Sequence, residues 1–279
     1  VLGGAFRVAP GGKGANQAIA AARAGATVTF LAAVGSDGYG ADFTTAWRSE
    51  GIDVSRVLVK PGPSGVALIV TDAEGRNQIA VAPGANALLA PADVAAVPPE
   101  TWRSGGAFVV QGESPPDTVH AALGRARAGG MTTIVNLAPY SVELAEAARG
   151  MTDYLIGNEG EMAAFFGLEE WPEAPSDHQV KVWLAKANAT LVTTLGEKGY
   201  WLAMGPAESP RTFAAPAPRV LVADSVGAGD AFVGVFAAAL AAGLEPARAA
   251  ARANCAAALA CTRPGADPPR REEIDAAEL

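Results

Sequence analysis

The residues with the clearest potential for chemistry lie at 224–230, directly before a long apolar segment at 231–244. Gly227 and Gly229 carry no side chains, so the backbone N–H groups at the start of a helix here could face an anion. Asp230 falls in the first turn of that helix, where a carboxylate that only caps the helix would be equally at home. On its own, the stretch favours a tight turn and a capped helix.

Two further glycine turns could bring the backbone close to a ligand. Residues 11–16 read Gly-Gly-Lys-Gly-Ala-Asn, and in them Lys13 and Asn16 could exchange hydrogen bonds with a hydroxylated ligand. A loop with a helix cap explains the same residues. Residues 194–199 read Thr-Leu-Gly-Glu-Lys-Gly, a turn at a strand end that suits a phosphate or a ribose but is common.

Asn158 and Glu161 stand at the start of a predicted helix, three residues apart on one face. Mg²⁺ takes few direct protein ligands and keeps its waters, which such a pair could hold. A capping Asn with a Glu in the first turn is an equally ordinary interpretation. Each of these signals is weak when taken singly.

The elements that would position these residues alternate between strands and helices, which predicts an α/β fold: a mainly parallel central sheet with helices on both faces. In such a fold the ligand lies beyond the carboxyl ends of the strands, where the polar turns above fall. Residues 64–71 and 77–82 interrupt the alternation and predict a β-hairpin, a small separate sheet that could act as a lid. The expected strands are 27–34, 107–111, 132–136, 154–157, 190–195, 200–204, 211–214 and 220–223. The expected helices are 18–23, about 41–50 after a turn at 35–40, 92–97, 116–128, 142–147, 159–166, 177–187, 229–242 and 246–262.

Composition limits the function classes. Half of the 279 residues are apolar and 18% are charged, which is typical of a globular chain. A net charge of −8 argues against nucleic acid or an anionic membrane as a partner. No apolar run of about eighteen residues predicts a membrane span, and no signal peptide is visible, so we expect a cytoplasmic protein. Cys255 and Cys261 match no zinc or disulfide pattern and are expected to be small buried residues.

Several common motifs are missing. Lys13 is followed by Gly14 instead of Ser or Thr, which excludes a Walker A motif, and no dinucleotide-binding G-x-G-x-x-G follows an early strand. His120 and His178 lie on predicted helices, remote from any nucleophile elbow.

Taken together, however, the motifs resemble those of the ribokinase-like carbohydrate kinases in their residue types, order and spacing, over essentially the whole chain. Residues 11–17, 64–69, 84–86, 111–115, 158–161, 194–199, 224–232 and 262–266 carry the resemblance. It implies ATP-dependent phosphorylation of a sugar, D-ribose at its 5-hydroxyl, assisted by Mg²⁺ and K⁺. The alternatives are a sibling sugar or nucleoside kinase of the same fold, and an inactive homologue that binds a sugar or nucleotide.

The resemblance also implies roles for individual residues. Asp230 matches the catalytic base, and Gly227, Ala228 and Gly229 match the anion hole for the transferring phosphoryl group. The implied sugar contacts are Gly12, Lys13, Asn16, Glu113 and Asp230. The implied ATP contacts are Asn158, Thr194, Gly196, Lys198, Gly199, Gly229 and Asn254. Asn158 and Glu161 would hold Mg²⁺ through water. Asp224, Val226, Ala260, Arg263 and Gly265 would form a K⁺ loop, in which Pro269 replaces a more usual residue with a side-chain oxygen.

The beginning of the chain departs from the family pattern. Val1 is not a methionine, and the first strand and sugar-binding Asp that the family carries have no counterpart before it, so we expect a clipped sequence. The resemblance further implies one kinase domain over 1–279, a β lid formed by about 1–9 and 62–82, and a homodimer that pairs through this lid.

Overall fold

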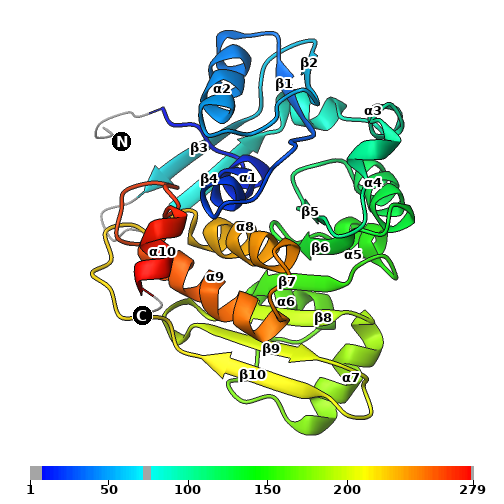
Figure 1. The fold of residues 1–279 in the computed structure, drawn as a ribbon, viewed down its shortest axis with the longest axis vertical. Coiled ribbons are helices and arrows are strands. Elements are labelled where there is room, and N and C mark those ends of the chain that lie inside the picture. The colour runs from blue at the N-terminus through cyan, green and yellow to red at the C-terminus, as the bar shows by residue number, and fades with distance from the viewer. Residues whose placement is uncertain (1–7, 72–76, 278–279) are drawn as a thin grey trace.

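A six-stranded sheet forms the centre of the part of the chain that the computed structural model describes, residues 8–71 and 77–277 (Figure 1). Its strand order is β10-β9-β8-β7-β6-β5. Strands β5 to β8 are parallel, whereas β9 and β10 each run antiparallel to the preceding neighbour. The strands are β5 (Ala107–Val110), β6 (Thr132–Asn136), β7 (Tyr154–Asn158), β8 (Thr190–Thr194), β9 (Tyr200–Met204) and β10 (Arg211–Ala215).

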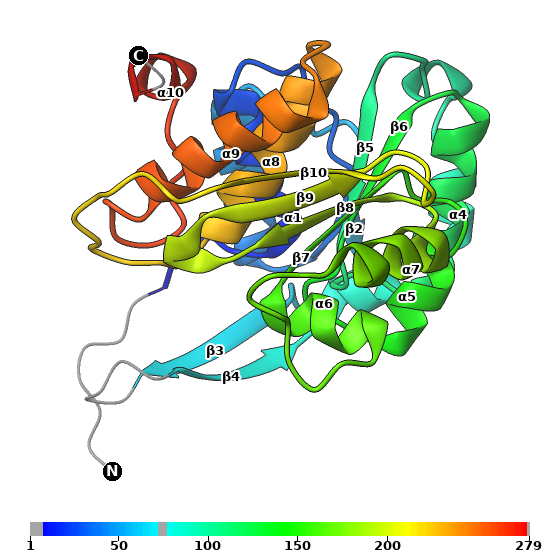
Figure 2. The same ribbon diagram turned by 90° about the horizontal axis from the view of Figure 1, so that it is seen from below.

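Helices cover both faces of this sheet, as predicted (Figure 2). One face carries α4 (Pro116–Ala128), α5 (Val142–Ala148), α6 (Glu159–Phe166) and α7 (Asp177–Ala187), over a core that includes Leu123, Leu155 and Trp183. The other carries α8 (Ala228–Ala241) and α9 (Pro246–Ala260), packed on Ile156 through Phe232 and Phe236. Apolar residues on facing positions of sheet and helix produce these two layers. Within the described residues, no helix is both long and apolar enough to cross a membrane.

Two smaller sheets lie outside the main one. Strands β1 (Ala32–Gly35) and β2 (Val57–Lys60) pair in parallel, joined by α2 (Gly38–Ser49). Strands β3 (Val66–Thr71) and β4 (Asn77–Ala82) form the predicted antiparallel hairpin, which extends away from the main sheet (Figure 2). The short helices η1 (Gly84–Leu88), α3 (Pro91–Ala95) and η2 (Pro99–Thr101) then lead to β5. Of the N-terminal segment assigned to the lid, residues 1–7 lie outside the described residues, and residues 8 and 9 are not in a strand.

The structure corrects three sequence predictions. The predicted strand at 220–223 is wrong, because this segment is a loop that pairs with no strand of residues 8–71 or 77–277; Ala223 N–H instead donates to the carbonyl of Cys261 at 2.8 Å. The apolar pattern suggested a strand, but Leu221 is 93% exposed. The sequence did not predict strand β2. It did not predict α10 (Arg271–Ala277) either, because the prolines before this helix suggested an irregular tail. Helix α10 depends on a distant contact, the full burial of Ile274 against the core.

Helix α1 (Lys13–Arg23) packs unusually closely on α8 at Gly234. A Cβ atom placed on Gly234 would lie 2.4 Å from the backbone oxygen of Gln17 and 2.6 Å from Cβ of Ala20. Neither neighbour can yield, since one is backbone and the other belongs to a fully buried residue. Glycine at this position therefore sets the distance between the two helices.

We predict that Gly234→Ala destabilises the protein by about 1–3 kcal/mol, the usual effect of inserting a methyl group into a tightly packed contact. Thermal or chemical unfolding measures the change. Gly124→Ala is the matched control, because Gly124 lies inside α4 and a Cβ there would meet nothing within 4 Å. Removing the entropic disadvantage of glycine should make the control more stable by about 0.5–1 kcal/mol. Equal effects of the two substitutions would contradict the close-contact role of Gly234.

Candidate active site

The carboxyl ends of the parallel strands bring the polar residues of the site to one edge of the sheet. Asn136 ends β6, Asn158 ends β7 and Thr194 ends β8, while Gln111 directly follows β5. The strand register places Asn158 opposite Thr194. Because the strands are parallel, residues more than 80 positions apart in the sequence meet at the same edge.

The start of α8 faces this edge with unpaired backbone donors. Gly227 is the N-cap residue and has a φ of 78°, a left-handed conformation that favours glycine, and a Cβ on it would lie 2.6 Å from that of Ala266. Among the described residues, none accepts a hydrogen bond from the N–H groups of Gly227, Gly229 or Asp230, whereas Ala228 N–H donates to Ser225 at 3.3 Å. The space beside Gly229 is open. This helix start can therefore bind an anion.

Asp230 is buried at the first turn of α8, with 8% of its surface exposed. Asn16 donates from Nδ2 to Asp230 Oδ2 at 2.9 Å, and Gln17 donates from Nε2 to Oδ1 at 2.9 Å. Burial raises the pKa of the Asp230 carboxyl above its usual value, while these two hydrogen bonds and the charge of Lys13 oppose the rise. A buried carboxylate with oriented donors on both oxygens has the properties of a general base.

The predicted sugar contacts surround Asp230. Lys13 N–H donates to Glu113 Oε2 at 2.7 Å, which joins the start of α1 to the loop after β5, and the position of a Gly12 Cβ would lie 3.8 Å from the same oxygen. Burial raises the pKa of Glu113, and the charge of Asp230 adds to that rise while Lys13 lowers it. The structure thus places Gly12, Lys13, Asn16, Glu113 and Asp230 in one site.

Asn158 and Glu161 cap helix α6 reciprocally. Asn158 Oδ1 accepts from Glu161 N–H at 2.9 Å, and Glu161 Oε2 accepts from Asn158 N–H at 2.8 Å. The capping interpretation is therefore correct, and no described residue bonds to Oε1 of Glu161. Burial raises the pKa of Glu161, while the hydrogen bond from Asn158 N–H and the charge of Lys13 oppose the rise. Since Asn158 ends β7, its bond to Glu161 places that side chain at the same edge of the sheet.

The oxygen atoms of Asn158 and Glu161 fit a magnesium ion that is held mostly by water and phosphate. Within the described residues, no group of three or more His, Cys, Asp or Glu side chains could hold a metal alone. Mg²⁺ is commonly bound by one or two carboxylates together with substrate phosphates, and Glu161 can supply one of these oxygens.

Five of the predicted ATP contacts, Thr194, Gly196, Lys198, Gly199 and Asn254, belong to elements that adjoin the segment after β10. In the turn η3 (Gly196–Lys198), the carbonyl of Glu197 accepts a hydrogen bond from Ala217 N–H at 3.4 Å. On the other side, the buried Asn254 of α9 donates from Nδ2 to the carbonyl of Pro216 at 2.9 Å. Thr194 and Gly199 flank the same turn. In the structure the Asn254 side chain positions this loop, and its predicted contact with ATP stays a prediction.

The residues of the predicted K⁺ loop also come together. Asp224 accepts from Val226 N–H at 3.0 Å and from Gly265 N–H at 2.8 Å, and these bonds hold the pKa of Asp224 below its usual value. The carbonyl of Ala260 accepts from Arg263 N–H at 3.2 Å, at the end of α9. The Asp224 side chain thus joins the turn before α8 to the loop after α9.

Sequence reasoning missed three buried amides of the site: Gln17, Gln111 and Asn136. Gln17 bonds to Asp230 and Asn136, and Gln111 bonds to Gln17. Asn136 carried a usable signal, since it is a polar residue that ends an apolar strand in the same way as Asn158. Gln17 carried none, because a single polar residue in a small-residue helix is most often exposed.

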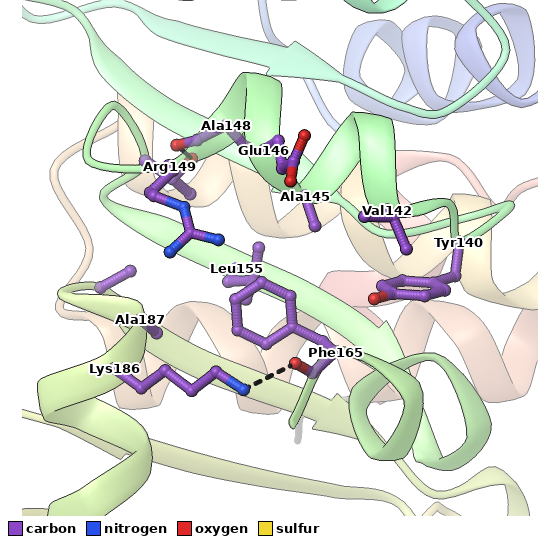
Figure 3. Close-up of a pocket in the computed structure, with 12 residues that line it drawn as sticks. Tyr140, Val142, Ala145, Glu146, Ala148, Arg149, Leu155, Phe165, Lys186 and Ala187 are labelled. Atoms are coloured by element: carbon purple, nitrogen blue, oxygen red, sulfur yellow. Dashed lines mark hydrogen bonds between the residues drawn. The ribbon is translucent and has the colours of Figure 1, made fainter. Parts of the chain in front are cut away.

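A cavity of about 120 Å³ lies away from this site, among α5, β7, α6 and α7 (Figure 3). Its lining includes Thr152, two residues before β7, and Ala189, directly before β8, so it lies toward the amino ends of these strands. Lys186 donates to the carbonyl of Phe165 at 3.2 Å, and Thr152 donates to that of Ala148 at 3.0 Å. Because the polar residues around Asp230 lie at the carboxyl ends of the strands, this cavity is separate from the candidate site.

Two relatives are similar over most of the chain. A ribokinase of Haemophilus influenzae is 32% identical over 275 residues, which cover 97% of this chain and 88% of the relative. A deoxyribokinase of Salmonella typhi is 33% identical over 238 residues, which cover 84% and 75%.

Solved structures of ribokinases are also similar to this chain. The ribokinase of Thermotoga maritima superposes with a TM-score of 0.82 at 30% identity, covering 98% of this chain and 88% of that one. The Arabidopsis thaliana ribokinase, solved with ribose and ATP, has a TM-score of 0.80 at 25% identity and coverages of 96% and 86%. The pfkB family of carbohydrate kinases matches residues 1–273. The chain therefore belongs to the pfkB family of carbohydrate kinases, enzymes that transfer a phosphoryl group.

Proposed function

We propose that the protein phosphorylates D-ribose at its 5-hydroxyl with ATP as donor. The observation that carries this proposal is the buried Asp230 carboxylate, which lies beside the donors of residues 12–16 at a helix start where the N–H groups of Gly227 and Gly229 have no acceptor among the described residues. The similarity to ribokinases and to a structure holding ribose and ATP supports ribose as the sugar.

Asp230 accepts the proton of the primary hydroxyl as the sugar oxygen attacks the γ-phosphorus. The N–H groups of Gly227 and Gly229, together with the dipole of α8, stabilise the negative charge that develops on the transferring group. Phosphoryl transfer depends mainly on positioning and charge stabilisation, which a rigid helix start provides.

The sugar lies against the start of α1 in this proposal. Lys13 and Asn16 donate to its hydroxyl groups, and Glu113 accepts from them. Gly12 leaves room for the ring. Thr194, Gly196, Lys198, Gly199 and Asn254 form the ATP pocket on the other side of the α8 start.

Two cations complete the proposed site. Mg²⁺, when bound, neutralises charge on the ATP phosphates, and Asn158 and Glu161 hold it through water. A K⁺ ion is proposed at Asp224, Val226, Ala260, Arg263 and Gly265, where the structure brings the two loops together. Pro269 supplies no side-chain oxygen to this loop.

Further parts of the proposal concern assembly and location. Hairpin β3–β4 exposes Leu68, Val70 and Val81, which are 59%, 66% and 64% exposed. A two-stranded sheet with exposed apolar side chains suits a lid that pairs with a second copy in a homodimer. Dependence on ATP favours the cytoplasm.

A deoxyribose kinase is the second candidate, because a deoxyribokinase is as similar as the ribokinases are. Fold and family do not determine which sugar is used.

ATP consumption measured against ribose, deoxyribose, fructose and adenosine, with and without K⁺, tests the proposal. We expect ribose to have the highest kcat/KM and K⁺ to increase it. A preference for deoxyribose would replace ribose with the second candidate. Phosphorylation of none of the four would refute the proposed function.

Asp230→Asn should bind ATP normally but lower kcat by about 10²–10⁴-fold, the contribution typical of a general base. Calorimetric titration with ATP and steady-state kinetics measure the two effects. Asp117→Asn is the matched control, since Asp117 is an exposed first-turn Asp of another helix, α4. Turnover by Asp230→Asn near that of the control would remove Asp230 from its role.

Lys13→Met should shift the acid limb of the kcat/KM profile to higher pH. Burial raises the pKa of Asp230, and the Lys13 charge offsets part of that rise, so its removal raises the pKa further. Asp230 then becomes protonated, and inactive as a base, at a higher pH than in the original protein. Lys181→Met on α7 changes the net charge equally and should leave the limb in place. An unchanged limb in both variants would contradict the coupling between Lys13 and Asp230.

A further inference from the structure

Gln17 is a buried amide behind the proposed base, with 2% of its surface exposed. Its Nε2 lies 2.9 Å from Asp230 Oδ1 and 3.0 Å from Asn136 Oδ1. Its Oε1 accepts from Gln111 Nε2 at 2.6 Å. The side chain is therefore bonded at both ends, and the proposed sugar contacts do not include it.

The orientation of this amide follows from a backbone carbonyl. Asn136 Nδ2 donates to the carbonyl of Ile156 at 3.2 Å, and a carbonyl can only accept. Asn136 Oδ1 must therefore point to Gln17, which requires the NH₂ group of Gln17 to face both Asn136 and Asp230. A reversed Gln17 would place its oxygen against two other acceptors and its NH₂ against that of Gln111.

We propose that Gln17 is a positioning residue that holds Oδ1 of Asp230 as a hydrogen-bond acceptor, so that Oδ2 receives the proton from the sugar hydroxyl. The inference rests on the proposed role of Asp230 as the base. A proton on Oδ1 would lose the hydrogen bond from Gln17, because the NH₂ of Gln17 cannot turn away or accept.

Oδ2 has a more adaptable neighbour. Asn16 is only half-buried, and its bond to Oδ2 is the one side-chain hydrogen bond that it makes within the described part of the chain. Its amide can rotate when Oδ2 becomes protonated. In the reaction, the hydroxyl O–H breaks and its proton moves to Oδ2, the sugar oxygen bonds to the γ-phosphorus, and ADP leaves with the electron pair of the broken P–O bond. The proton later passes from Oδ2 to solvent.

The groups that face Asp230 from the surrounding elements are Asn16, Gln17 and the charged Lys13, Glu113 and Glu161. None of the charged three bonds to Oδ1 in the structure. The hydrogen bond from Gln17 is thus the specific stabilisation of the ionised form at this oxygen.

Gln17→Met tests the proposal, because it retains the length of the side chain and removes the donor. We expect kcat to fall about 10- to 100-fold, the range for one hydrogen bond to a charged group, with KM for sugar and ATP unchanged. The acid limb of the kcat/KM profile should move to higher pH. Thr118→Val is the control for stability alone, since it removes a buried 2.7 Å bond to Leu89 outside the site, and its pH profile should not move.

Gln17→Glu is the second variant, for the case that Gln17→Met does not fold. It still accepts from Gln111 but places a second carboxylate beside Oδ1, so the pair shares a proton and the acid limb should move further than in Gln17→Met.

A double-mutant cycle between Gln17 and Asp230 tests this inference separately from the proposed function. In an Asp230→Asn background, Gln17→Met should cause no additional loss of kcat. An equal loss in both backgrounds, or a pH limb that moves in neither Gln17 variant, overturns the positioning role even where Asp230→Asn is inactive. Full turnover by Asp230→Asn alone would instead refute the function on which the inference rests.

Discussion

The close contact between α1 and α8 is the constraint on which the site depends. Gly234 lets the backbone of Gln17 approach α8 to a distance that no larger residue would permit. Asn16 and Gln17 then reach the Asp230 carboxylate, which lies one helical turn before Gly234. A small widening of this contact would separate both donors from the proposed base, since hydrogen bonds weaken over a few tenths of an ångström. The close packing of α1 on α8 is therefore also a requirement for the hydrogen bonds to the proposed base.

The charge balance of the site explains why backbone donors are needed. Asp230, Glu113 and Glu161 all respond to the single charge of Lys13, and burial raises the pKa of each carboxyl. With a net charge of −8, the protein has no general attraction for a polyanion such as ATP. The unpaired N–H groups at the start of α8 and a bound cation would supply the positive potential locally.

The sequence predicted most of the fold because its elements follow local patterns, whereas the roles of the site residues come from the family resemblance and stay predictions. Alternating strands and helices, the hairpin at β3–β4 and the turn before α8 all follow from apolar runs and glycines. Loop 220–223 and helix α10 were mispredicted because distant contacts decide them. The loop bonds to the end of α9, and α10 depends on the burial of Ile274.

By itself, the sequence determined the class of fold, the order of the polar turns and the residue types that resemble a carbohydrate kinase. Only the tertiary structure decided how the amides of Gln17, Gln111 and Asn136 are directed. Their orientation begins at the carbonyl of Ile156 in β7 and ends at Asp230, across two strands, the residue that follows β5, and two helices. Hydrogen-bond direction is a property of neighbours in space, and periodicity along the chain carries no information about it.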